Sequence, residues 1–143
     1  MCGIVGGVAN TDIIPLLLDG LKRLEYRGYD SSGLVILSQN NKLVRERAVG
    51  KVINLKKKLK LNKNKIEGTI GLAHTRWATH GEPSDKNAHP HISKNSISVV
   101  HNGIIENYLD LKDSQIEQGY EFTSETDTEV IAHAIDFAMQ SSN

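Results

Sequence analysis

A run of small and apolar residues begins at the third position of the chain, in the opening Met-Cys-Gly-Ile-Val-Gly-Gly. Residues 3–9 include two valines and one isoleucine and are followed by the polar residues 10–12, a pattern that predicts a β-strand. A fold built on this sequence must therefore place its first residues at the end of a rigid element. Cys2, the only cysteine of the chain, comes directly before this strand.

The remaining pattern predicts several strands and helices in mixed order. A helix is expected over residues 12–24, with its cap among residues 10–12 and Pro15 in its first turn. A polar turn at residues 39–42 predicts a hairpin. The other expected elements are strands over residues 32–38, 43–48, 69–74 and 96–101, and helices within residues 51–65 and over 107–118 and 126–139, the last opening with a capping-box pattern from Thr126 to Glu129. This mixture predicts the α+β class.

The composition indicates one domain without an extreme charge. The 143 residues carry 17 Lys plus Arg and 17 Asp plus Glu, so the whole-chain charge favours neither nucleic acid nor an anionic membrane as partner. Residues 56–65 contain six lysines, for which a nucleic-acid patch and a solvated helix face followed by a loop are alternatives. We favour the solvated face, because no aromatic residue lies among these lysines to stack on bases.

The sequence shows none of the marks of a secreted or membrane protein. One cysteine cannot form an internal disulfide, which suits a reducing compartment. The start lacks the charged leader, apolar run and cleavage site of a signal peptide, and no apolar stretch reaches the ~20 residues of a membrane helix. We therefore expect a cytoplasmic globular protein.

Cys2 has the chemistry of a nucleophile if Met1 is removed. The thiol then supplies the attacking sulfur, and the new α-amino group, with a reference pKa of about 7.7–8.0, accepts a proton near neutral pH. The alternative is a small, chemically inert cysteine, which describes most free cysteines. Position alone does not separate these two interpretations.

Four polar segments are candidates for the rest of a site, at residues 24–33, 74–83, 101–107 and 124–129, and the first three contain glycine. The side chain of Asn102 beside the backbone N–H of Gly103 supplies two donors for a developing oxyanion. Arg76 and Asp127 complement the α-carboxylate and the α-ammonium of a substrate amino acid.

Each segment also has an ordinary structural interpretation. Asn-Gly is a common turn signal, Arg76 fits a surface ion pair, Trp77 fits a core position, and Asp127 fits the first turn of a helix. The pair His89 and His91 suggests a metal. The chain has no His-Glu-x-x-His or Cys-x-x-Cys spacing, so we expect no metal site.

Taken together, the Cys-Gly-Ile-Val-Gly start and the segments around Arg76, Asn102-Gly103 and Asp127 resemble the class II glutamine amidotransferases. The resemblance spans the whole chain. Residues 24–33, 74–83, 88–91 and 101–107 are most similar to the branch that converts fructose 6-phosphate to glucosamine 6-phosphate. The resemblance implies an N-terminal-nucleophile hydrolase fold, a four-layer sandwich with two β-sheets between helical layers.

The resemblance also implies residue roles. Cys2 would attack the side-chain amide of L-glutamine and form a thioester, with its α-amino group as the proton shuttle and with Asn102 and Gly103 as the oxyanion hole. The implied substrate-binding residues are Arg76, Trp77, Thr79, His80 and Asp127, with Arg27 in a supporting role. No cofactor is expected.

In that family the glutaminase domain continues past residue 139 and two sugar-isomerase domains follow. Residues 1–143 are therefore expected to be an incomplete glutaminase domain. In the full-length enzyme the implied partners are fructose 6-phosphate, a C-terminal sugar-isomerase domain and a second copy in a homodimer. The alternatives are a catalytically silent fragment, another class II amidotransferase and a histidine-based metal-binding module.

Overall fold

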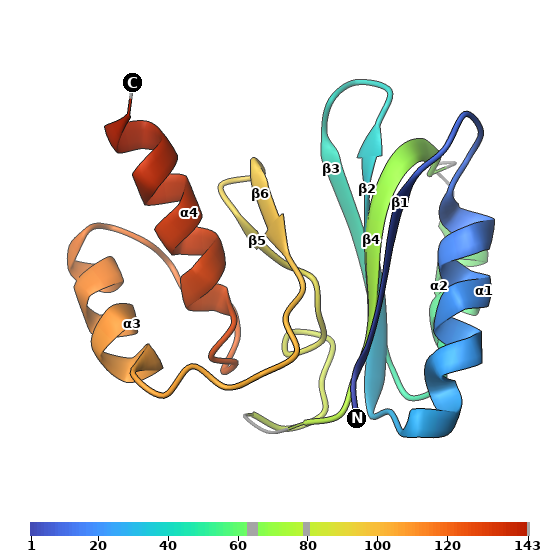
Figure 1. Cartoon of the computed structure of the whole chain (residues 1–143), viewed down its shortest axis with the longest axis horizontal. Helices are drawn as coiled ribbons and strands as arrows, with labels where there is room; N and C mark the ends of the chain where they lie inside the picture. Colours follow the sequence, from blue (N-terminus) through green and yellow to red (C-terminus); the bar gives the residue numbers. More distant parts are fainter. Residues whose placement is uncertain (63–65, 79–80, 143) are drawn as a thin grey trace.

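The computed structural model describes residues 1–62, 66–78 and 81–142, which build four layers in the order helix, sheet, sheet, helix (Figure 1). The first layer holds α1 (Ile14–Leu24) and α2 (Val52–Leu61), and the last holds α3 (Tyr108–Glu117) and α4 (Glu129–Ser141). Between them lie a four-stranded sheet and a two-stranded sheet. The expected α+β class and the order of layers are confirmed. Within the described ranges, no helix is long and apolar enough to cross a bilayer.

The larger sheet has the strand order β1-β4-β2-β3, formed by β1 (Gly3–Val8), β4 (Gly68–Arg76), β2 (Ser31–Ser38) and β3 (Leu43–Val49). Every pairing in it is antiparallel, and β2 and β3 form the predicted hairpin. The register pairs Gly3 with Thr75 and Ser31 with Arg76. The start of the chain and the start of β2 therefore both lie beside the end of β4.

The helix layer covers one face of this sheet with apolar side chains. The buried cluster consists of Ile13, Ile14, Leu17, Leu21, Leu34, Ile36, Ala48, Val52, Leu55 and Ala73. Full burial of a large aliphatic side chain contributes about 1.5–3 kcal/mol. Because these side chains are buried together, this interface is the main apolar core of the described chain.

The predicted cap of the first helix is displaced by one residue. Ile13 occupies the N-cap position, and Pro15 lies in the first turn as expected. The Asp12 carboxylate accepts hydrogen bonds from the N–H groups of Ile14 (3.4 Å) and Gly68 (3.3 Å). Asp12 therefore ties the start of α1 to β4, a tertiary role that local pattern does not show.

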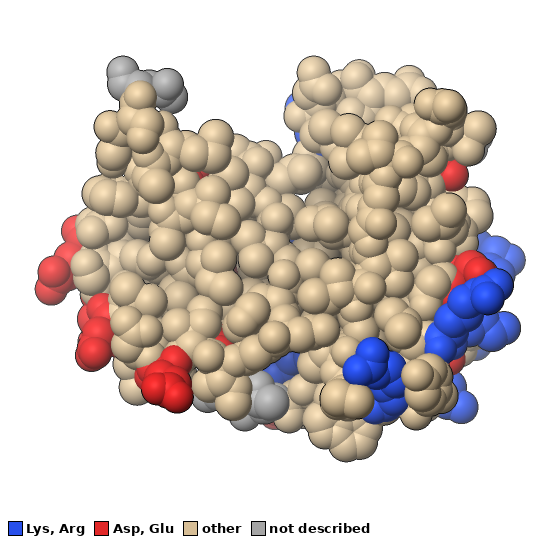
Figure 2. All heavy atoms as spheres, in the orientation of Figure 1, with Lys and Arg blue, Asp and Glu red and all other residues tan. Residues whose placement is uncertain are grey.

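The lysines of α2 are exposed, and Lys58 also bonds the Arg47 carbonyl and the Asp85 carboxylate. Figure 2 shows Lys and Arg gathered over the end of the molecule that holds α1 and α2, and Asp and Glu over the end that holds α3. Lys56, Lys57, Lys58 and Lys60 are exposed, which agrees with a solvated helix face, while Lys63 and Lys65 lie outside the described residues.

The inner face of the large sheet is polar rather than apolar. Successive side chains of a strand point to opposite faces, so His74 and Arg76 face away from α1 and α2, whereas Ala73 faces the core. Arg47 on β3 donates to the carbonyls of Lys86 (2.9 Å) and Ala88 (3.0 Å). These bonds hold the segment before the second sheet against the first.

The second sheet differs from the sequence expectation. It pairs β5 (His91–Ser93), which was not predicted, with β6 (Ile97–Val99), which is shorter than the strand expected over residues 96–101. β5 is only three residues long and follows Pro90, so it is too short to show the period of a strand in the sequence. β6 ends where its partner ends, because a strand needs a partner for its backbone hydrogen bonds.

The capping box expected from Thr126 to Glu129 is wrong. α4 begins at Glu129, and Thr128 at its N-cap makes no side-chain cap bond. The Glu129 carboxylate instead accepts bonds from the N–H and hydroxyl of Thr123 (both 2.9 Å) and from those of Ser124 (2.8 and 2.6 Å). These upstream donors satisfy the carboxylate, so residues 126–128 stay outside the helix.

Candidate active site

Most of the predicted site residues line one cavity of about 380 Å³, at the place where the ends of β1 and β4 meet the segments after β6 and before α4. Those residues are Cys2, Arg27, Arg76, Trp77, Asn102, Gly103 and Asp127. Thr79 and His80 lie outside the described residues. A cavity of this size suits a small-molecule ligand.

Strand pairing places Cys2 at this cavity. The Gly3 N–H donates to the Thr75 hydroxyl (3.1 Å), and the Trp77 N–H donates to the Cys2 sulfur (3.1 Å). The Met1 α-amine donates to the Arg27 carbonyl oxygen (2.8 Å), which anchors the terminus beside the thiol. While Met1 is present the Cys2 nitrogen is part of a peptide bond, so it has no basic lone pair.

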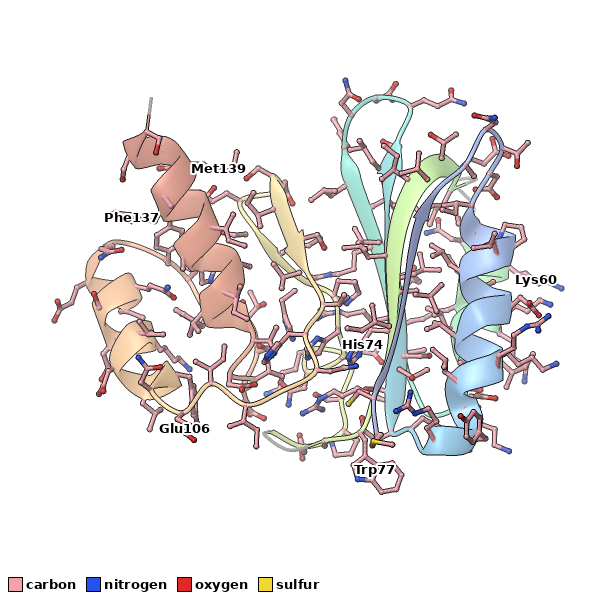
Figure 3. All side chains as sticks on the ribbon, viewed as in Figure 1. Lys60, His74, Trp77, Glu106, Phe137 and Met139 are labelled. Atoms are coloured by element: carbon pink, nitrogen blue, oxygen red, sulfur yellow. The ribbon has the colours of Figure 1, made fainter. Side chains whose placement is uncertain are left out.

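Trp77 is held over a glycine. Gly28 has a φ of +98°, which side chains disfavour, and a Cβ added there would lie 2.4 Å from the indole ring. Both the backbone conformation and the lack of space therefore require glycine at this position. The Trp77 side chain is 54% exposed and lies at the end of the sheet near the N-terminus (Figure 3). The interpretation of Trp77 as a core residue is therefore wrong.

Arg76 is a buried cation, not a surface one, with a relative exposure of 3%. Its guanidinium donates to the carbonyls of Gly81 (3.1 Å) and Glu82 (3.3 Å), and one nitrogen lies 3.8 Å from the Asp30 carboxylate. The same carboxylate accepts the N–H of Ala78. These oxygens fix the charge at the cavity wall.

Asn102 and Gly103 lie on an exposed irregular segment after β6. The Asn102 side-chain oxygen is 2.7 Å from Nε2 of His74. A Cβ at Gly103 would lie 2.7 Å from Nε2 of His101, so glycine here lets the backbone pass close to that imidazole. Any larger residue at position 103 would therefore require the His101 side chain to move.

Asp127 is 4% exposed and lies two residues before α4, not in its first turn. One carboxylate oxygen accepts the Ile105 N–H (2.7 Å). This bond ties the segment of Asp127 to the segment of Asn102 and Gly103. Two parts of the sequence more than twenty residues apart thus form one wall of the cavity.

The cavity also contains residues that the sequence analysis did not assign, namely Met1, His74, His89, His101, Ile104, Thr126 and Thr128. The His74 and His89 rings stack with centroids 4.2 Å apart, and His89 meets His91 edge-on at 4.6 Å. Burial lowers the pKa of His74 to about 4 and lowers the pKa values of His89 and His91 as well. The sequence feature that could have pointed to His74 is its position at the end of the strand predicted over residues 69–74.

The histidines do not gather as metal ligands. Among the residues that the structure describes, no group of three His, Cys, Asp or Glu side chains has the arrangement to hold a metal ion. Stacked imidazole rings with lowered pKa values indicate neutral side chains packed on one another.

The relatives found among known proteins agree with one another in their described function. A family described as "Glutamine amidotransferase domain" matches residues 61–139. The glutamine–fructose-6-phosphate aminotransferase (isomerizing) of Acinetobacter baylyi is 60% identical over 139 residues, and that of Pseudomonas putida is 55% identical over 141. These alignments cover 97% and 99% of this chain but 22% and 23% of the relatives, so the chain spans about a fifth of their length.

Solved structures agree at the level of the fold. A glutamine phosphoribosylpyrophosphate amidotransferase from B. subtilis superposes with a TM-score of 0.69 and 28% identity, over 94% of this chain and 28% of that one. A second structure, described as the allosteric regulatory enzyme of purine biosynthesis, has a TM-score of 0.69 and 29% identity over similar shares.

Proposed function

Because the chain belongs to the glutamine amidotransferase domain family, we propose that its cavity binds L-glutamine and that Cys2 hydrolyses the side-chain amide to glutamate and ammonia. One observation carries this proposal. The only cysteine of the chain, one residue from the terminus, lines the same cavity as a buried arginine and a buried aspartate.

The reaction begins once Met1 is removed. The Cys2 sulfur attacks the amide carbon of glutamine, and the thiol proton passes to the freed α-amine, whose reference pKa of about 7.7–8.0 suits this transfer. The C–N bond then breaks, and the amine returns the proton to the departing ammonia. Water hydrolyses the γ-glutamyl thioester, which gives glutamate and restores the thiol.

The negative charge of the tetrahedral intermediate falls on the former amide oxygen. The side-chain NH2 of Asn102 and the backbone N–H of Gly103 are the donors for it. Groups of this kind stabilise the transition state more than the ground state, because the charge develops only during attack.

Two opposite charges select an amino acid over a simple amide. In this proposal Arg76 binds the α-carboxylate of glutamine and Asp127 binds the α-ammonium. Trp77, Thr79 and His80 cover the bound glutamine. Arg27, which lines the same cavity, has a supporting role in this proposal.

For the longer protein that the relatives represent, we extend the proposal one step further. The released ammonia would convert fructose 6-phosphate to glucosamine 6-phosphate in a sugar-isomerase domain, within a cytoplasmic homodimer. The names of the relatives and their identities of 54–60% support this choice over another class II amidotransferase.

Intact-mass analysis and glutaminase assays of the natural full-length chain test the proposal. We expect a mass without Met1, and we expect Cys2→Ala to abolish glutamate release. Asp113→Ala, an exposed change on α3, is the matched control and should retain activity. Glutamate release by Cys2→Ala would contradict the assignment of the nucleophile, and a full-length wild-type protein with no glutaminase activity would contradict the proposed function.

A further inference from the structure

His74 is a buried histidine that lines the cavity, and its side chain makes a hydrogen bond to the side chain of Asn102. It lies on β4 with a relative exposure of 1%, and Figure 3 shows it between the two sheets. Its Nε2 is 2.7 Å from the side-chain oxygen of Asn102. The mechanism above assigns no step to this histidine.

The orientation of the Asn102 amide decides whether it works as an oxyanion donor. A carboxamide has one acceptor end and one donor end, which are related by a rotation of half a turn. An exposed asparagine with no fixed partner would present either end to the cavity. When its oxygen is engaged by a donor from the protein, its NH2 group is the end that remains for the substrate.

The surroundings of His74 favour a neutral ring in a fixed position. The ring stacks on His89 with an interplanar angle of 15°. Burial and the neighbouring Arg76 charge oppose protonation, which agrees with a pKa lowered to about 4. A neutral imidazole carries one N–H, so at neutral pH it donates from one nitrogen only.

We infer that His74 is a positioning residue, which donates its Nε2–H to the Asn102 oxygen and thereby directs the Asn102 NH2 toward the oxyanion. This inference rests on the proposed function, since it concerns the same transition state. His74 itself touches neither the substrate nor the reacting atoms in this scheme.

The first experiment is steady-state glutaminase kinetics of the natural full-length chain. His74→Phe keeps a flat ring against His89 but removes the donor, and we expect kcat to fall about tenfold or more with KM little changed, because an oxyanion contact acts in the transition state. His74→Gln restores an amide donor and should recover part of the loss. A kcat within about twofold of wild type for His74→Phe would overturn the inference.

The control is His133→Phe. His133 is likewise buried, at 4% exposure, but it lies on α4, bonds Ser93 (2.8 Å) and does not line the cavity. Both phenylalanine variants should lose some stability, and only His74→Phe should lose kcat. Equal kcat losses in the two variants would assign His74 a merely structural role.

A double-mutant cycle with Asn102→Ala separates positioning from packing. Once the amide is absent, His74→Phe should cost about twofold or less in kcat, whereas an independent role predicts the same loss in both backgrounds.

If His74→Phe does not fold, neutron diffraction of the wild-type protein decides, since a proton on Nδ1 rather than Nε2 would overturn the inference. Wild-type protein without glutaminase activity contradicts the proposed function, whereas active wild type with uncoupled variants contradicts only this inference.

Discussion

Oxygen atoms surround the buried guanidinium group of Arg76. The carbonyls of Gly81 and Glu82 and the carboxylate of Asp30 lie along its nitrogens at 3.1–3.8 Å. A guanidinium has a planar fork of donors, and this geometry matches the two oxygens of a carboxylate. The residue is therefore suited to hold a carboxylate in one orientation.

Arg76→Lys is the corresponding prediction at the scale of a residue. An ammonium group keeps the charge but not the fork, so we expect the KM for glutamine to rise about ten- to hundredfold, since a bond to a charged group contributes about 1.5–3 kcal/mol. The measurement is steady-state glutaminase kinetics. Arg23→Lys, at an exposed position on α1, should behave as wild type. An unchanged KM for Arg76→Lys would remove Arg76 from the binding site.

At the scale of the elements, the start of α4 holds the segment of Asp127, which forms part of one wall of the cavity. Glu129 is 1% exposed, and its carboxylate accepts four hydrogen bonds from Thr123 and Ser124. The chain between these partners is a closed loop that contains Asp127. Helix α4 thus supplies the anchor for a segment that is itself not helical.

Glu129→Gln tests this anchor. The substitution replaces one acceptor oxygen with an NH2 group that faces N–H and hydroxyl donors, so we expect the free energy of unfolding to fall by about 1–3 kcal/mol and the KM for glutamine to rise. Urea unfolding and kinetics together measure the two effects. Glu117→Gln, at an exposed site on α3, is the control. Wild-type stability in Glu129→Gln would show that the loop is held by other contacts.

The whole molecule has two interiors of different character. Aliphatic side chains fill the space between the helices and the large sheet, whereas histidines and arginines fill the space between the two sheets. The cavity beside Cys2 is lined by residues of this polar layer, among them His74, Arg76 and His89. Similarity to amidotransferase structures at a TM-score of 0.69 confirms the N-terminal-nucleophile hydrolase fold that carries this arrangement.

The polar interior predicts a loss of stability in mild acid. Burial lowers the pKa of His74 from 6.5 to about 4 and also lowers the pKa values of His89 and His91. Between pH 6.5 and 4 the unfolded chain therefore binds more protons, so stability rises with pH and falls as acid is added. Within this window each such histidine changes the free energy of unfolding by at most about 1.4 kcal/mol per pH unit.

Urea unfolding at pH 7 and at pH 5.5 measures this dependence. The His74→Gln variant should show a shallower fall, because it lacks one of the groups that take up a proton on unfolding. A free energy of unfolding that is equal at both pH values would contradict neutral, buried histidines between the sheets.

The sequence by itself determined the elements with strong periodicity and the chemistry of the separate segments. The strand after Cys2, the hairpin of β2 and β3, and the helices α1, α3 and α4 followed from spacing, because apolar periodicity is a local property. Arg76, Asn102, Gly103 and Asp127 were chosen by their charge and donor groups, which also belong to single residues or neighbours.

Only the tertiary structure decided which of these residues meet. The antiparallel register of β1 on β4 brings Cys2 beside Trp77, and the bond from Ile105 to Asp127 joins two loops. His74 on Asn102, the displaced start of α4 and the short strand β5 likewise depend on partners far along the chain. Such contacts depend on strand register and side-chain packing. The spacing of residues along one segment determines neither of them.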